Sequence, residues 1–174
     1  MSDNIILVGF MGTGKSAIGR RLAGILKRPF YDADLEMERV TGMSLMRLCQ
    51  KYGKIRFQSE EKLVLNKLLQ KENSVIAAGG TFVVDEEWLV QLRKSGKIIC
   101  LTARNEVIRE RVLRRNNRPF LRKECINEDI AEQIPDREMM LCQADFVVDT
   151  SDKSLEEVVD LILSYCEREM DGIL

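Results

Sequence analysis

Residues 9–16 read G-F-M-G-T-G-K-S and directly follow the apolar residues 5–8. This spacing of two glycines before Lys-Ser is typical of a loop that joins a β-strand to an α-helix and binds phosphate groups. The glycines let consecutive N–H groups turn inward, and the N-terminus of the next helix adds positive charge. Residues 16–27 fit that helix, because four apolar residues lie on one side of it: Ile18, Leu22, Ile25 and Leu26. We therefore favour a nucleotide-binding loop over a tight turn without nucleotide.

The side chains at the end of this loop predict the ligands. Lys15 can reach the β- and γ-phosphates of ATP, and the Ser16 hydroxyl can ligate Mg²⁺. ATP and Mg²⁺ are the expected cofactors. The residues expected to bind the nucleotide in this segment are Gly12, Thr13, Gly14, Lys15, Ser16 and Ala17.

Short apolar segments alternate with helical ones along the chain, which indicates a mainly parallel sheet covered on both faces. The 174 residues are most simply one domain, 1–174. We expect strands over 4–8, 29–31, 74–78, 97–102 and 146–149. Helices are expected over 16–27, 45–51, 56–70, 86–94, 106–115, 128–142 and 155–170.

Composition excludes several classes of function. A net charge of −1 argues against a nucleic-acid partner, although residues 104–123 are rich in arginine, which suits either a polyanionic ligand or a solvated basic face. The chain has five cysteines, with no C-x-x-C pair, and no histidine, so a zinc site is not expected and proton transfer must use carboxylates or lysine. No run approaches the ~20 apolar residues of a membrane span. We expect a cytoplasmic monomer without a signal peptide.

Two carboxylates follow the second expected strand, at Asp32 and Asp34. In sheets of this kind ligands bind beyond the carboxyl ends of the strands, so both should face the phosphate-binding loop. If the strand continues through them, period-2 alternation puts both side chains on one side. One would hold Mg²⁺ and the other would orient or deprotonate an acceptor hydroxyl. The alternative is that either residue caps a helix that starts near Leu35.

Three further signals come later in the chain. The adjacent Gly79 and Gly80 would let a ligand approach the backbone closely, or simply form a turn. Arg118 lies in an irregular basic segment, within an expected mobile lid at about 112–127, where it could neutralise charge on a transferred phosphoryl group. Arg137 could bind a carboxylate bidentately, or pair with Asp136 or Glu138 on the surface.

In this order and spacing, the motifs resemble the shikimate kinase family, a group of small kinases related to nucleoside-monophosphate kinases. The resemblance covers nearly the whole chain and rests on five segments: 5–16, 30–34 (F-Y-D-A-D), 75–80 (V-I-A-A-G-G), 117–121 (N-R-P-F-L) and 144–150 (A-D-F-V-V-D-T). It implies a three-layer α/β/α fold with a five-stranded parallel sheet. It also implies transfer of the γ-phosphate of ATP to the 3-hydroxyl of shikimate.

The resemblance also implies a role for each matching residue. Lys15, Asp34 and Arg118 would be catalytic, and Ser16 and Asp32 would hold Mg²⁺. Arg111 would pack on adenine, which the loop carrying Lys153 would border. The acceptor site, built partly by a helical region at about 33–61, would include Asp34, Arg56, Gln58, Gly79, Gly80 and Arg137.

The chain departs from the family pattern in the acceptor half of the site. The family's G-E-x-x-F-R-x-x-E reads G-K-I-R-F-Q-S-E-E at 53–61, which puts Gln58 at the carboxylate-binding arginine and Arg56 two residues away, about 200° around a helix. Thr81 replaces a glycine, and the segment after Arg137 is altered. Two alternatives therefore stay open: a kinase for another hydroxy acid or polyol such as gluconate, and a non-catalytic ligand-sensing module.

Overall fold

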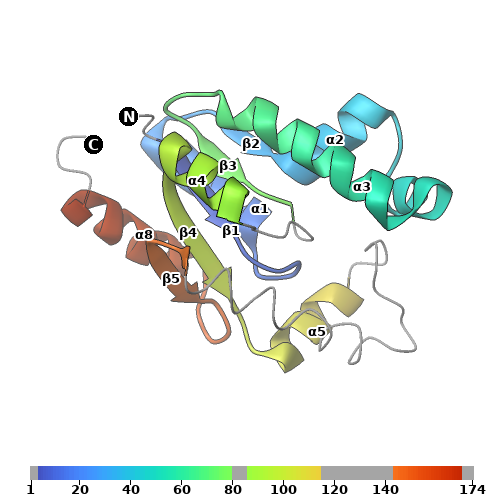
Figure 1. Cartoon of the computed structure of the whole chain (residues 1–174). Coiled ribbons are helices and arrows are strands. Elements are labelled where there is room, and N and C mark those ends of the chain that lie inside the picture. The colour runs from blue at the N-terminus through green and yellow to red at the C-terminus, as the bar shows by residue number, and fades with distance from the viewer. Residues whose placement is uncertain (1–3, 80–85, 115–142, 170–174) are drawn as a thin grey trace.

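The computed structural model describes residues 4–79, 86–114 and 143–169. Its centre is a five-stranded sheet with the order β2-β3-β1-β4-β5, in which every pair of neighbours is parallel. The strands, shown in Figure 1, are β1 (Asn4–Val8), β2 (Phe30–Asp32), β3 (Val75–Ala77), β4 (Gly96–Thr102) and β5 (Phe146–Asp149). The predicted parallel α/β fold is confirmed.

The helices alternate with these strands along the chain. They are α1 (Lys15–Leu26), α2 (Ala33–Thr41), α3 (Leu45–Leu69), α4 (Glu86–Ser95), α5 (Asn105–Leu113) and α8 (Leu155–Glu169). The helix predicted over 128–142 lies outside the described residues. None of the helices in the described ranges has the length and apolar character needed to cross a membrane.

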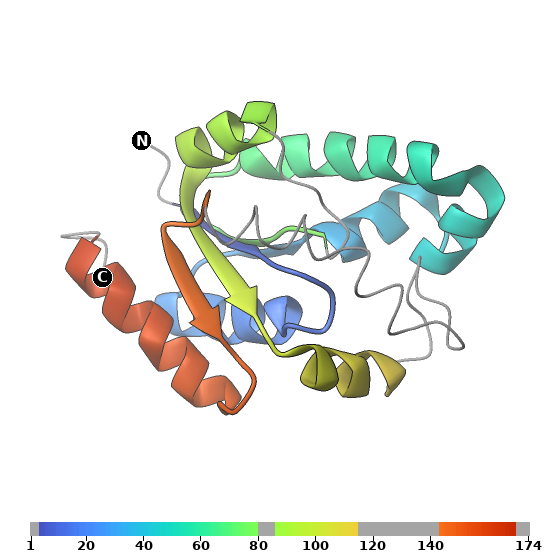
Figure 2. The ribbon, with the colours of Figure 1, turned by 60° about the horizontal axis from the view of Figure 1, so that its bottom comes forward.

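The buried strands are apolar on both faces because helices cover both sides of the sheet. In β1, Ile5 and Leu7 join a core cluster with α1 and α8, while Ile6 and Val8 join another with α2, α3 and α4. Figure 2 shows α3 and α4 above the sheet and α1 and α8 below it. Alternate side chains of one strand thus pack into two apolar cores, one on each face of the sheet, and this gives the α/β/α layering.

A third apolar cluster lies past the carboxyl ends of β1 and β4. Phe10 and Met11 of the glycine-rich loop pack there against Ala103, Ile108 and Val112. This contact fixes α5 beside the loop, so residues more than ninety positions apart in sequence line one end of the sheet (Figures 1 and 2).

Two details differ from the sequence prediction. The second strand does not continue to Asp34: it ends at Asp32, and α2 begins at Ala33 rather than near Leu35. The two helices predicted on either side of residues 52–55 form one element, α3, which is bent at Gly53, where φ is 76° and ψ is 178°. The break predicted between residues 51 and 56 is confirmed at Gly53, whose backbone is not helical; only the joining of both helices in one element, α3, differs from the prediction.

Candidate active site

The glycine-rich loop between β1 and α1 has the backbone that the motif requires. Gly9, Gly12 and Gly14 all have positive φ angles, of 134°, 84° and 100°. A Cβ at Gly9 would lie 2.2 Å from the backbone oxygen of Leu101, so a side chain there is excluded by close approach as well as by conformation. Gly14 is the N-cap of α1 and no side chain caps the helix, which leaves its first N–H groups for a ligand.

Lys15 is drawn into this loop. Its Nζ donates to the backbone oxygens of Gly9 at 2.6 Å and Phe10 at 3.1 Å, and the residue is only 7% exposed. Thr13 is buried as well, and its hydroxyl donates to the same Phe10 oxygen at 2.8 Å. Side-chain hydrogen bonds from Lys15 and Thr13 to backbone oxygens therefore stabilise the loop, and the buried Lys15 ammonium lies at its centre.

A cavity of about 290 Å³ opens at this end of the sheet. The whole nucleotide segment from Gly12 to Ala17 lines it, together with Asp32 and Asp34. The end of α5, the turn before α8 and the start of α8 complete the lining, with Arg111, Arg114, Thr150, Lys153, Ser154 and Leu155 among their residues. The structure thus brings together every predicted nucleotide and metal residue, at the carboxyl ends of the strands as expected.

The two carboxylates reach the cavity by a different route from the one predicted. Asp32 ends β2 and is the N-cap of α2, where its Oδ1 accepts a hydrogen bond from the backbone N–H of Asp34 at 3.1 Å. Asp34 lies in the first turn of α2, where a negative charge is favourable. Asp32 therefore caps α2 and lines the cavity at the same time. The cap orients its carboxylate, and both Asp32 and Asp34 face the phosphate-binding loop.

Gly79 lies where β3 leads out of the sheet beside two carboxylates. A Cβ there would be 2.1 Å from an oxygen of Glu61 and 3.1 Å from an oxygen of Asp34. Glu61 is only 2% exposed, although it carries a carboxylate. The sequence motifs give Glu61 no role. Its position four residues after the apolar Phe57 nevertheless predicts that it lies on the buried face of a helix, where a carboxylate is rare unless it is paired.

The turn between β5 and α8, residues 149–154, forms the far wall of the cavity. Arg111 donates to the hydroxyl of Thr150 at 2.9 Å, to its backbone oxygen at 2.8 Å and to the backbone oxygen of Gly12 at 3.3 Å. Hydrogen bonds from the hydroxyl and the backbone N–H of Ser151 lower the pKa of Asp149. Arg111 thus joins the phosphate-binding loop to this turn, a link that the 39 positions between Arg111 and Thr150 hide in the sequence.

The predicted acceptor residues are only partly described. Arg56 is exposed and pairs with Glu60 at 2.5 Å, one turn along α3, and Gln58 is half-buried; neither lines the cavity. Gly80, Arg118 and Arg137 lie outside the described residues, as do Thr81 and most of the predicted lid. Their roles stay predictions.

Comparison with known proteins agrees with this geometry. The family model for shikimate kinase matches residues 11–167. A shikimate kinase from Pelotomaculum thermopropionicum is 46% identical over 95% of this chain and 96% of its own length, and one from Desulforudis audaxviator is 44% identical over 95% and 87%. A solved structure, shikimate kinase from Acinetobacter baumannii in complex with shikimate, has a TM-score of 0.91 and 29% identity, and the match covers 99% of this chain and 97% of that one.

Proposed function

Since the chain belongs to the shikimate kinase family, we propose that it transfers the γ-phosphate of ATP to the 3-hydroxyl of shikimate. The observation that carries this proposal is that the phosphate-binding loop, Asp32 and Asp34 line the same cavity. The family and the geometry support this function over a gluconate kinase or a non-catalytic ligand sensor.

The residues of the cavity fit ATP with Mg²⁺. Polyphosphate suits the uncapped N-terminus of α1 and the buried ammonium of Lys15, because both offer positive charge where water is largely excluded. Ser16 and Asp32 would hold Mg²⁺, which in such sites needs only one or two protein ligands beside the phosphates. The ion supplies neutralisation of charge on the β- and γ-phosphates.

On the acceptor side, Asp34 would accept a hydrogen bond from the attacking hydroxyl and take its proton, since the chain has no histidine. Gly79 has no side chain, which lets the buried Glu61 carboxylate lie against its backbone next to Asp34. Arg118 would neutralise charge on the transferred group from a lid at about 112–127, and Gly80 and Arg137 would contact shikimate. Arg111 and Lys153 would border the base of the nucleotide.

The direct test is a coupled assay of ADP release with purified protein, comparing shikimate with gluconate. We expect turnover with shikimate far above the ATPase background and none with gluconate. Asp34→Asn should reduce kcat by about 10²-fold or more, because the hydroxyl loses its orienting base. Release of ADP that shikimate does not increase would reject the proposal.

The missing arginine at position 58 makes a sharper test possible. An arginine–carboxylate contact is bidentate and charge-assisted, which a glutamine cannot reproduce. We expect Gln58→Arg to lower KM for shikimate about tenfold without changing KM for ATP. A raised KM for shikimate in Arg56→Gln would instead assign the carboxylate contact to Arg56, which would have to leave Glu60.

We also propose that the enzyme is a cytoplasmic monomer that binds neither membranes nor nucleic acid. The net charge of −1 supports the absence of a nucleic-acid partner, which would favour a basic protein surface. Light scattering during size-exclusion chromatography is the measurement for the monomer, with a mass near 20.0 kDa expected.

A further inference from the structure

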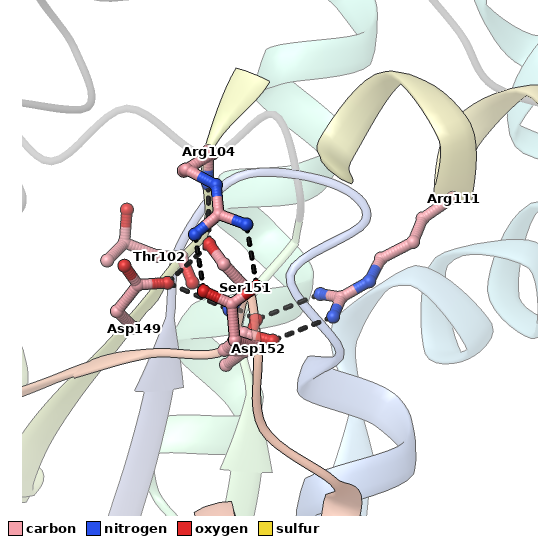
Figure 3. Close-up of polar contacts among 7 residues, drawn as sticks. Thr102, Arg104, Arg111, Asp149, Ser151 and Asp152 are labelled. Carbon is pink, nitrogen blue, oxygen red and sulfur yellow. Dashed lines mark hydrogen bonds and ion pairs between the residues drawn. The ribbon is translucent and has the colours of Figure 1, made fainter. Parts of the chain in front are cut away.

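An exposed ion pair joins the residue before α5 to the turn at residues 149–154 (Figure 3). The guanidinium of Arg104, the residue that precedes α5, contacts both carboxylate oxygens of Asp152, at 2.5 Å and 2.6 Å. The backbone N–H of Arg104 also donates to the hydroxyl of Ser151 at 2.9 Å. Neither Arg104 nor Asp152 lines the cavity.

The inner side of the same turn belongs to the cavity. Thr150, Lys153 and Ser154 line it, as does Arg111, which donates to the hydroxyl and the backbone oxygen of Thr150. Asp152 therefore lies between two residues of the cavity lining, with its side chain held outside by Arg104. Two arginines from opposite ends of α5 thus contact the turn: Arg104 at Asp152 and Arg111 at Thr150.

We propose that Arg104 and Asp152 are positioning residues for the nucleotide: their ion pair holds the 149–154 turn in the shape that receives the base end of ATP. The inference rests on the proposed nucleotide function. A turn that is ordered before binding loses less conformational freedom when the ligand arrives, and this raises affinity without a new contact. The pKa of Asp152 is lowered and that of Arg104 is raised, as expected of a formed pair.

The size of the effect follows from exposure. The side chains of Arg104 and Asp152 are 52% and 72% exposed, so water and salt weaken the pair. We expect Arg104→Ala and Asp152→Asn each to raise Kd for MgADP by about threefold to fivefold at low salt. The double variant should bind no worse than the weaker single variant, and the difference should vanish in about 1 M salt.

Measuring binding and kinetic constants on the same variants distinguishes a positioning role from a general loss of folded structure. MgADP binding is measured by calorimetry, and KM for ATP, KM for the acceptor and kcat are measured on the same variants. We expect a rise in KM for ATP only, with partial rescue in Arg104→Lys, which keeps the charge but not the two-pronged contact. The charge-swapped pair Arg104→Asp with Asp152→Arg should bind MgADP better than either Arg104→Asp or Asp152→Arg alone.

Arg39→Ala is the matched control. Arg39 forms an equally short pair with Glu36 on α2, at 2.5 Å, in which the arginine is 73% exposed and the glutamate 28%, and the pair does not line the cavity. It should leave Kd for MgADP unchanged. If the wild type binds MgADP and Arg104→Ala and Asp152→Asn bind it equally well, the inference is wrong while the proposed function stands. If the wild type does not bind MgADP, both are wrong.

Discussion

At the scale of single residues, this site is defined by charges placed where water has little access. Lys15 is buried, and its ammonium donates to two backbone oxygens of its own loop, which hold it at the centre of that loop. Asp32 is fixed by its role as a helix cap. Both groups are therefore preorganised, which is what electrostatic stabilisation of a transition state requires.

Lys15→Ala removes the buried cation of the loop. We expect kcat to fall by about 10²-fold or more, because charge on the transferred phosphoryl group loses its nearest stabilising group. Turnover is measured by ADP release and folding by thermal denaturation. A variant that keeps kcat within a factor of about ten of the wild type would contradict the role of Lys15.

Ser151→Ala should raise the pKa of Asp149 towards its ordinary value, because the hydroxyl hydrogen bond is the largest cause of its lowering. A carboxyl whose pKa is lower in the folded state stabilises that state fully above its unfolded pKa, near 4, and loses this stabilisation as the pH falls through the folded pKa. The variant should therefore lose less stability than the wild type below about pH 4. Carbon NMR of the carboxyl group measures the pKa directly, and an unchanged value would refute the assignment.

At the scale of elements, α3 shows how a single residue shapes the acceptor side. Ser44 caps its start by accepting from the N–H of Arg47, and buried residues line its inner face from Phe57 onward. Gly53 interrupts it with a backbone conformation, φ 76° and ψ 178°, that is essentially confined to glycine. The bend sets the direction of the second half of α3, which carries Gln58 and Glu61.

Gly53→Ala tests this bend. No atom lies within 4 Å of the position of the new Cβ, so any effect comes from backbone strain and not from a clash. We expect a loss of about 1–3 kcal/mol in the free energy of unfolding, measured by urea denaturation.

Gly24→Ala in α1 is the matched control, because its Cβ would also meet nothing within 4 Å but its φ is not positive. It should increase stability by about 0.5–1 kcal/mol. Equal effects of the two substitutions would show that the bend at Gly53 carries no strain for alanine.

At the scale of the whole molecule, the two halves of the site come from opposite layers. The phosphate-binding loop, α5 and the turn before α8 form one side of the cavity, whereas the proposed acceptor half lies between β3, α2 and α3. The parallel sheet joins them because all its strands end at the same edge. Disturbing one half should therefore leave the other intact.

Gly79→Ala tests that independence. Its Cβ would lie 2.1 Å from an oxygen of Glu61, so the buried carboxylate and α3 must shift away from β3. We expect kcat/KM for shikimate to fall by about tenfold or more, while Kd for MgADP stays unchanged. Loss of MgADP binding in a folded Gly79→Ala protein would show that the two halves are coupled.

The sequence by itself determined the nucleotide half of this protein. The glycines at 9, 12 and 14, with Lys15 and Ser16, act within one local segment whose flanking strand and helix are short-range patterns, and all of it folds as predicted. The strands were predicted to within one or two residues because buried parallel strands are apolar on both faces.

Only the tertiary structure decided what brings distant residues together. Glu61 beside Gly79 and Asp34, Arg111 on Thr150 and Arg104 on Asp152 are contacts across helices and strands, which no local periodicity encodes. The helix start at Ala33, two residues before the expected position near Leu35, is set by the cap at Asp32. Local sequence determines the conformation of the phosphate-binding loop, whereas long-range packing builds the walls of the cavity beside it.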